Sequence, residues 1–332
     1  MATSYMYQHY VECEECSSDV REPVQWHCTK HKRSLCDTCK TTHNSNQCKI
    51  IPYTDRFNEN FDKNPTFASE VTCPYNFLRD IGSAGHDQFW ILSSRSKDLK
   101  LIDSKGQEIK NVKTDDQPWR LTVSHDRKFV FYTDIRAKVV KKVDAKSGKI
   151  AQMFATGEYE PRGIGACQSG HLLVCLYSSK NMSGKVIKYN QAGKEISEIE
   201  YDKNKRNLFT KPQYVIENKF GGICVSDSER REVILVDENG DHLFSYDGNK
   251  AIGVLEQFTP EGIATDSRGN FLVADFWNST IHIIKDNGAF VCYLLFGKIE
   301  SPTGITIDAS DRLGVCEYST TSGVVKVLSY LK

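Results

Sequence analysis

The sequence has no excess of charge and no long apolar run. In the chain of 332 residues, 43 Lys and Arg residues balance 43 Asp and Glu residues. A balanced chain has no overall attraction to nucleic acid or to an anionic membrane, although a local basic patch remains compatible with it. The apolar run 172–177 is far shorter than the roughly 20 residues that span a bilayer. No basic, then apolar, then small-residue pattern opens the chain, so we expect a soluble, cytoplasmic protein.

The N-terminal region lacks the aliphatic residues that a hydrophobic core needs. Residues 1–60 are rich instead in Cys, His and charge, and domains this small usually depend on disulfides or metal. Six of the twelve cysteines fall in this region, between positions 13 and 48. The other six are scattered through apolar segments, where cysteine usually behaves as a small buried hydrophobe.

The clustered cysteines and two histidines have the spacing of zinc ligands. Three pairs are each separated by two residues and two single ligands follow, which gives the eight ligands of two tetrahedral sites. A disulfide framework is the main alternative, but a secretory signal is missing and histidine stands at ligand spacing. The predicted ligands of two structural zinc ions are Cys13, Cys16, Cys28, His31, Cys36, Cys39, His43 and Cys48.

A repeat of 42 to 51 residues fills the chain from residue 66 to residue 332. Each repeat contains short strand-like runs separated by Gly, Asn and Asp turns, and no helical period competes. Four short antiparallel strands in a repeat of this length indicate a blade of a β-propeller. The sequence therefore predicts an all-β fold with six blades, which begin near Pro74, Pro118, Pro161, Pro212, Pro260 and Pro302.

The sixth repeat ends without a fourth strand. A ring with an open blade would expose unpaired strand edges. The segment 66–73 has the right length to fill the gap, so we expect it to pair with the last blade and close the propeller. The remaining boundaries are then an N-terminal tail at 1–10, a zinc finger at 11–53 and a polar linker at 54–65.

Two segments resemble known families. The run Pro260-Glu-Gly-Ile, followed by the turn 266–270 and the strand-like run 271–275, resembles the NHL repeat of six-bladed propellers. The cysteine-histidine spacing over 11–53, with Trp26 before it and Lys49-Ile-Ile after it, resembles a B-box zinc finger. Together the two segments resemble the B-box plus NHL proteins of the tripartite-motif superfamily, without their RING and coiled coil.

The B-box resemblance implies how the ligands divide between the two zinc ions. In such fingers the ligand pairs interleave, so Cys13, Cys16, Cys36 and Cys39 would hold one ion, and Cys28, His31, His43 and Cys48 the other. His31 and Cys48 depart from the usual residue types, and His27 competes with His31 for the second ion. Both sites would be structural, because four protein ligands leave no open position for water.

The resemblance also directs the functional expectation. Only twelve residues precede Cys13, so we expect no RING, no ubiquitin transfer by the chain alone and no enzymatic activity. The sequence favours a zinc-binding adaptor, in which the finger mediates protein interaction or self-association and the propeller loops bind a protein. The alternatives are an RNA-binding post-transcriptional regulator, a ubiquitin-ligase component that acts with a RING-bearing relative, and a metal-dependent propeller hydrolase.

Basic residues in the inter-strand loops form the candidate binding site. Aromatic residues lie among them, a combination that suits single-stranded RNA, but acidic residues share the same loops and nearly balance the charge. The candidate ligand-binding residues are Arg120, Arg136, Lys138, Arg162, Arg230 and Arg231.

Acidic residues recur at the ends of the second strands, and isolated histidines occur through the propeller. We interpret the acidic residues as acceptors of backbone N–H groups from the following loops, rather than as a calcium-binding or catalytic ring. They are Asp134, Asp227, Asp275 and Glu317. We expect the histidines at 125, 171, 242 and 282 to be turn or surface residues.

Overall fold

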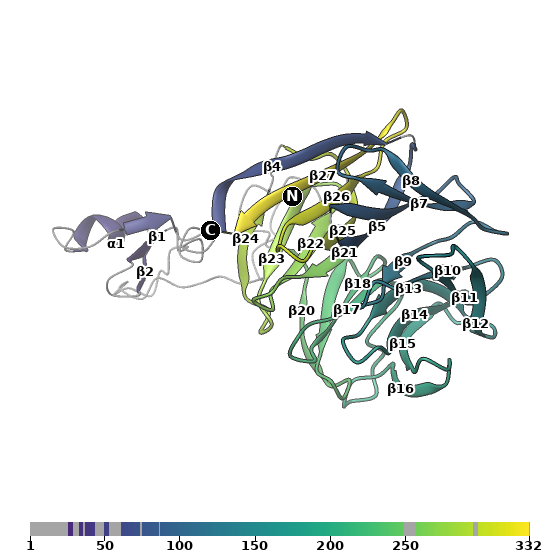
Figure 1. Cartoon of the computed structure of the whole chain (residues 1–332). Helices are drawn as coiled ribbons and strands as arrows, with labels where there is room; N and C mark the ends of the chain where they lie inside the picture. The colour runs from purple at the N-terminus through teal and green to yellow at the C-terminus, as the bar shows by residue number, and fades with distance from the viewer. Residues whose placement is uncertain are drawn as a thin grey trace. The chain divides into compact units, whose positions relative to one another are not determined.

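The chain divides into two compact units, residues 1–63 with 249–254 and 332, and residues 64–248 with 255–331. The computed structural model, drawn in Figure 1, describes residues 26–28, 33–35, 37–43, 50–52, 61–73, 75–85, 87–248, 257–294 and 298–331. No helix within these ranges is both long and apolar enough to cross a membrane.

The first unit contains a small antiparallel sheet and a short helix. Strand β1 (Trp26–Cys28) lies between β2 (Arg33–Leu35) and β3 (Ile50–Pro52). Helix α1 (Asp37–Thr42) follows β2, and the N–H of His43 donates to the carbonyl of Cys39 at 2.9 Å. Among the residues of this unit whose burial is described, Leu35 is the one buried apolar side chain.

The predicted zinc ligands fall mostly outside the described residues. Cys13, Cys16, His31, Cys36 and Cys48 lie outside them, and so does the side chain of Cys28, although its backbone belongs to β1. Cys39 and His43 are described, and His43 is buried. No group of three His, Cys, Asp or Glu side chains that could hold a metal occurs in the described part of the chain. The two zinc sites therefore stay a prediction.

The second unit is an all-β propeller of six four-stranded blades, and that prediction is confirmed. Neighbouring strands within a blade pair in antiparallel register, and the first strand of each blade lines the central channel.

The first three blades consist of β5 (Leu78–Gly85), β6 (Gln88–Ser93), β7 (Asp98–Asp103) and β8 (Glu108–Lys113); β9 (Leu121–Val123), β10 (Phe129–Asp134), β11 (Val139–Asp144) and β12 (Ile150–Ala155); and β13 (Glu160–Ala166), β14 (Leu172–Ser178), β15 (Ser183–Tyr189) and β16 (Glu195–Ile199). The last three consist of β17 (Pro212–Glu217), β18 (Ile223–Asp227), β19 (Glu232–Val236) and β20 (His242–Tyr246); β21 (Pro260–Thr265), β22 (Phe271–Asp275), β23 (Thr280–Ile284) and β24 (Phe290–Leu294); and β25 (Pro302–Ile307), β26 (Leu313–Glu317), β27 (Gly323–Leu331) and one strand from the other end of the chain.

That strand is β4 (Phe61–Cys73), which lies beside β27 as the outermost strand of the sixth blade (Figure 1). It contains the segment 66–73 and begins at Phe61, so residues 61–65 are strand rather than linker. An outermost strand pairs on one side only, and it therefore tolerates Pro65, which lacks a backbone N–H. Val71 and Cys73 on β4 are buried in the apolar cluster between the sixth and first blades.

Burial decreases from the middle of a blade to its outer edge. All residues of β14 are buried, because this strand has neighbouring strands on both sides and neighbouring blades on both faces. In the outermost strand of the same blade, β16, every residue except Ile199 is exposed. The second strands are therefore near-continuous apolar runs, as is typical of sheets covered on both faces.

The acidic residues at the ends of the second strands hold the adjoining loops, as the sequence predicts. Asp227 accepts hydrogen bonds from four backbone N–H groups, at 2.7 and 2.9 Å from residues 210 and 211 and at 3.1 and 3.0 Å from residues 229 and 230. Asp134, Asp275 and Glu317 accept backbone N–H bonds in the same way. The predicted bonds from the following loop are confirmed for Asp134 and Asp227. The backbone N–H groups that donate to Asp275 and Glu317 belong to Thr259 and Glu300, in the loops that precede the first strands of their blades.

His282 is a correction to the sequence analysis. It is fully buried in β23 rather than in a turn or at the surface, because the third strand of the fifth blade is enclosed by its neighbours. Its Nε2 lies 3.2 Å from Oδ2 of Asp275, and its Nδ1 lies 2.9 Å from the hydroxyl of Tyr246. Lysines on the third strands of two other blades lie near the equivalent acids, in the pairs Lys141–Asp134 at 3.7 Å and Lys326–Glu317 at 2.8 Å.

Candidate functional site

Irregular strand pairing marks one residue of each blade, at the start of the first strand. In five blades the register between the first and second strands shifts near the start of the first strand. A shift of this kind is a β-bulge, which changes the direction of a side chain from the regular alternation between the two faces of the sheet. In the second blade the equivalent residue directly precedes β9. We call this set the channel ring: Arg79, Arg120, Arg162, Gln213, Glu261 and Thr303. We call the side of the propeller on which it lies the proline face, and the opposite side the turn face.

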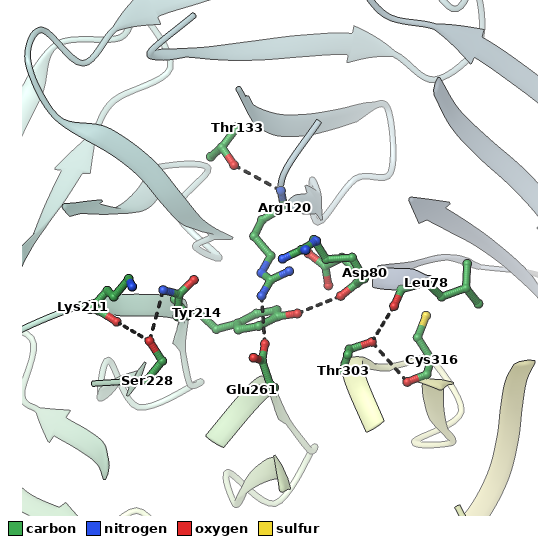
Figure 2. A network of polar contacts seen from close by, with 12 residues as sticks. Leu78, Asp80, Arg120, Thr133, Lys211, Tyr214, Ser228, Glu261, Thr303 and Cys316 are labelled. Atoms are coloured by element: carbon green, nitrogen blue, oxygen red, sulfur yellow. Dashed lines mark hydrogen bonds and ion pairs between the residues drawn. The ribbon is translucent and has the colours of Figure 1, made fainter. Parts of the chain in front are cut away.

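Two side chains cross the channel at the ring. Arg120 of the second blade donates from Nη2 to Oε2 of Glu261 in the opposite fifth blade, at 2.9 Å. The hydroxyl of Tyr214, in the fourth blade, donates to the carbonyl of Arg79 in the opposite first blade, also at 2.9 Å. The guanidinium carbon of Arg120 lies 4.1 Å from the centre of the Tyr214 ring, so the two crossing side chains stack (Figure 2). The ring is therefore closed by two connections that join opposite blades.

Glycines beside the ring allow the inner strands to approach each other closely. A Cβ atom on Gly163, Gly262 or Gly304 would lie 2.6, 2.3 or 2.5 Å from a backbone atom of the neighbouring blade. The Pro-x-Gly segments of the repeats therefore serve packing of the first strands. At the same repeat position the fourth blade carries Tyr214, whose side chain reaches across the channel.

The backbone around Arg120 is fixed by Thr133 on β10. The N–H of Arg120 donates to the Thr133 hydroxyl at 3.2 Å, and the N–H of Thr133 donates to the carbonyl of Arg120 at 3.0 Å. The N–H of the preceding Trp119 donates to the carbonyl of Thr133 at 2.8 Å. Thr133 is completely buried, so the Trp119-Arg120 pair rests on a rigid part of the second blade.

The ring contains charged groups that have lost most of their contact with water. Arg120 is 2% exposed, and Asp80, beside it, is 3% exposed. Burial raises the pKa of Asp80 to about 6, although Arg120 and two backbone N–H donors act against this rise. Burial also lowers the pKa of Arg79 to about 10, and the positive charge of Arg120 adds to the effect. A further negative charge near Arg79 would therefore be favourable.

Trp119 is the common neighbour of three ring arginines. Its ring centre lies 3.8 Å from the guanidinium carbon of Arg79 and 5.7 Å from those of both Arg120 and Arg162. Arg162 is neutralised by Glu160, whose carboxylate lies 2.7 Å away. Within the described ranges no carboxylate lies at ion-pair distance from Arg79, and neither Nε of Arg79 nor Nε1 of Trp119 has a hydrogen-bond acceptor.

Aromatic residues continue the site over the fifth, sixth and first blades. Ring centres are separated by 4.9 Å between Trp277 and Phe276, by 6.0 Å between Phe276 and Tyr318, and by 5.3 Å between Tyr318 and Phe77. We call these four residues the aromatic row. The guanidinium of Arg95 lies 3.7 Å from the centre of the Phe77 ring, and Trp277 is 64% exposed. The loops that carry the row follow second strands or precede a first strand, so they open on the proline face.

The structure separates the predicted binding residues into two groups. Arg120 and Arg162 belong to the channel ring, together with Arg79, which the sequence analysis missed. In four of the other blades the ring residue directly follows the repeat's proline, but Arg79 is separated from Pro74 by residues 75–78, so this spacing does not point to it. The other predicted residues lie in loops after second strands: Arg136 and Arg231 are exposed, Lys138 donates to the carbonyl of Glu158 at 2.8 Å, and Arg230 pairs with Glu232 at 3.1 Å.

A separate cavity opens towards the turn face. Its volume is about 830 Å³, and its walls are the later parts of the six first strands and the turns that follow them. Asp80 and Tyr214 are among its lining residues, so the cavity extends up to the side chains that cross the ring. Hydroxyl groups such as those of Ser83, Thr122 and Thr306 lie along it.

Comparisons with known proteins agree with the fold. The NHL repeat matches residues 259–284, in the fifth blade, and no curated protein matches the chain. Streptogramin B lyase shares 13% identity over 81% of this chain and 98% of its own, with a TM-score of 0.57. Regucalcin, a calcium-binding protein from Agrobacterium tumefaciens, shares 11% identity over 80% and 97%, with a TM-score of 0.59. A chain of a nidogen–laminin complex shares 13% identity over 70% and 85%, with a TM-score of 0.56. At these identities the likeness shows the fold alone.

The comparisons correct one expectation. We expected from the missing RING that the chain is not an enzyme, and this inference is contradicted by a structural neighbour that is a lyase. A propeller of this fold can carry catalysis without a RING. The neighbours therefore remove the argument against enzymatic activity, and they assign no reaction to this chain.

Proposed function

We propose that the second unit is a protein-binding propeller whose ligand docks on the proline face. The observation that carries the proposal is the meeting of the channel ring with the aromatic row. The ring supplies a partly buried guanidinium without a carboxylate partner among the described residues, and the row supplies exposed and partly buried aromatic surface. Trp, Tyr and Arg are the side chains that most often dominate the binding energy of protein interfaces.

The charge pattern supports a protein ligand over RNA. Several cations of this face are already paired with acidic side chains: Arg162 with Glu160, Arg230 with Glu232, and Lys141 with Asp115 and Asp134. A single strand of RNA needs a groove of cations that follows many phosphates. On the proline face the ring arginines gather around the single side chain of Trp119, beside further aromatic rings, and do not form a long cationic groove; this arrangement suits one acidic group of a protein.

The proposal predicts that Trp277→Ser removes a specific protein partner. Trp277 is 64% exposed on the proline face, and Phe220, which is 63% exposed in a turn between first and second strands, provides a matched control on the turn face. Wild-type full-length chain and the two variants would be crosslinked in cells and purified, and the recovered proteins would be quantified by mass spectrometry. We expect proteins whose recovered amount falls at least tenfold with Trp277→Ser and is unchanged with Phe220→Ser.

The same samples test the RNA alternative. Ultraviolet crosslinking would recover RNA that disappears in an Arg136/Lys138/Arg230/Arg231→Glu variant if the chain were a post-transcriptional regulator. Such a result, with no protein partner sensitive to Trp277→Ser, would overturn the proposed function.

For the first unit we propose a B-box-like finger with two structural zinc ions, and an adaptor role in which this finger contacts a partner or a second copy. The ligand spacing supports the proposal, together with the buried position of His43 next to α1. Membership of the tripartite-motif superfamily, action with a RING-bearing ubiquitin ligase and a cytoplasmic location rest on the sequence and stay predictions.

Cys36→Ser tests the zinc finger. Because a finger of this size folds only with its metal, we expect the variant to lose at least one of two bound zinc ions and the folded state of residues 11–53. The propeller has its own core, so its melting temperature should stay within about 2 °C of wild type. Zinc would be measured by mass spectrometry of the intact holoprotein and folding by calorimetry. A wild-type chain purified without zinc, or a propeller that melts with the finger, would contradict the proposal.

A further inference from the structure

We propose that the proline face recognises one carboxylate of its partner, seated at Arg79 beside Trp119, with an adjacent apolar side chain on the aromatic row. This inference rests on the proposed function and names the chemistry that the partner presents. The carboxylate can come from an Asp or Glu side chain or from a chain terminus.

The unpaired charge of Arg79 is the first argument. Arg120 has Glu261 and Arg162 has Glu160, whereas Arg79 has no carboxylate at ion-pair distance among the described residues. Arg79 is also held against Trp119, which fixes the plane of its guanidinium and reduces the conformational freedom that binding would remove. Planar forks of this type bind a carboxylate through two parallel hydrogen bonds.

The neighbouring charges favour a group with one negative charge. The negative charge of Glu261 acts to raise the pKa of Arg79, and Glu160 lies beside Arg162 in the same ring. A doubly charged phosphate would face both carboxylates, whereas a carboxylate neutralises Arg79, the ring arginine that has no carboxylate at ion-pair distance among the described residues. The expected ligand is therefore an acidic position in an otherwise unphosphorylated peptide.

The aromatic row accounts for the neighbouring position of the ligand. Phe77 directly precedes β5, the strand that carries Arg79, and its ring contacts Tyr318, which contacts Phe276, so the row begins close to the arginine. It ends at the exposed ring of Trp277. A side chain next to the carboxylate would bury its apolar surface against these rings.

The test selects peptides from two random libraries on the purified full-length chain. One library displays internal sequences and the other displays free C-termini, so that the two sources of the carboxylate are separated. We expect selected peptides with Asp or Glu, or a free C-terminal carboxylate, next to an aromatic or large aliphatic residue. Replacement of that carboxylate by its amide should weaken binding about 10-fold to 100-fold.

Arg79→Gln and Arg127→Gln form the matched pair of variants. Arg127 is exposed in the turn between β9 and β10, on the turn face, so Arg127→Gln should leave peptide binding within about twofold. Arg79→Gln should abolish the preference for the carboxylate over the amide, while circular dichroism confirms that the propeller is folded. Peptides selected without an acidic group, or an acid preference that survives in Arg79→Gln, would overturn the inference and leave a protein-binding propeller. Failure of both libraries, with single-stranded RNA bound in a filter assay, would overturn the proposed function as well.

Discussion

A chain without residues 61–73 should lose a stable propeller. The deletion removes β4, leaves the edge of β27 unpaired and takes Val71 and Cys73 out of the cluster between the sixth and first blades. Burial of a valine side chain contributes about 2 kcal/mol, and the lost strand pairing adds to this cost. We expect the melting temperature to fall by about 10 °C or more, or the cooperative transition to disappear, in calorimetry.

A chain without residues 1–60 is the control, since it retains β4 complete. Its propeller should melt within about 2 °C of the wild-type propeller, because the second unit has its own core. Equal melting temperatures for the two deletions would show that β4 does not close the ring.

Arg120→Met should destabilise the propeller by about 3–5 kcal/mol, the cost of removing one partner of a buried charge pair. The substitution keeps an apolar stem but leaves Glu261 without its partner and Asp80 without the nearest buried cation. It also removes the stack on Tyr214, and with it one of the two connections between opposite blades. Urea unfolding followed by fluorescence would measure the change in the free energy of unfolding.

Two further variants show whether the effect belongs to the crossed pair. Arg162→Met removes a pair whose arginine is 17% exposed, against 2% for Arg120, while the two glutamates are similarly exposed at 21% and 23%, so we expect a loss of about 1 kcal/mol or less. Tyr214→Phe removes only the bond to the Arg79 carbonyl and should cost about 1 kcal/mol. If Arg120→Met lowered the free energy of unfolding by no more than Arg162→Met does, the connection across the channel would not contribute to the stability of the propeller.

The blades could be predicted from the sequence because their signals are local. A proline lies at or near the start of most first strands, a glycine turn follows most third strands, and the apolar runs between them are long enough for one strand each. The bonds from the following loops to Asp134 and Asp227 were also predicted correctly, since they join residues close in the sequence. Such features can be predicted without knowing how neighbouring blades pack against each other.

The channel ring could not be predicted in the same way. Its side chains reach the channel through bulges, and a bulge is a mismatch between two strands that neither strand shows alone. Arg120 reads as a loop cation in the sequence, and only the closed ring brings Glu261 opposite to it. His282 was misplaced for the same reason, because its burial depends on the neighbouring blade.

Residues at equivalent positions of the six blades differ in how far they recur, and this distinguishes positions that serve packing from positions that serve binding. The acid at the end of the second strand recurs in four blades and performs the same structural task in each. The ring position instead changes from Arg in the first three blades to Gln213, Glu261 and Thr303 in the others. Similar blades need the same packing residue at the same position, so a packing residue recurs from blade to blade. A side-chain charge that differs from blade to blade around the ring is suited to one ligand in one orientation.

The most direct test of the account is a crystal structure of the full-length chain with a peptide from the libraries. We predict that the peptide lies on the proline face, with a carboxylate at hydrogen-bond distance from the guanidinium of Arg79 and an apolar side chain on the aromatic row. A peptide bound in the cavity of the turn face, or along the outer strands of the blades, would contradict the assignment of the binding site.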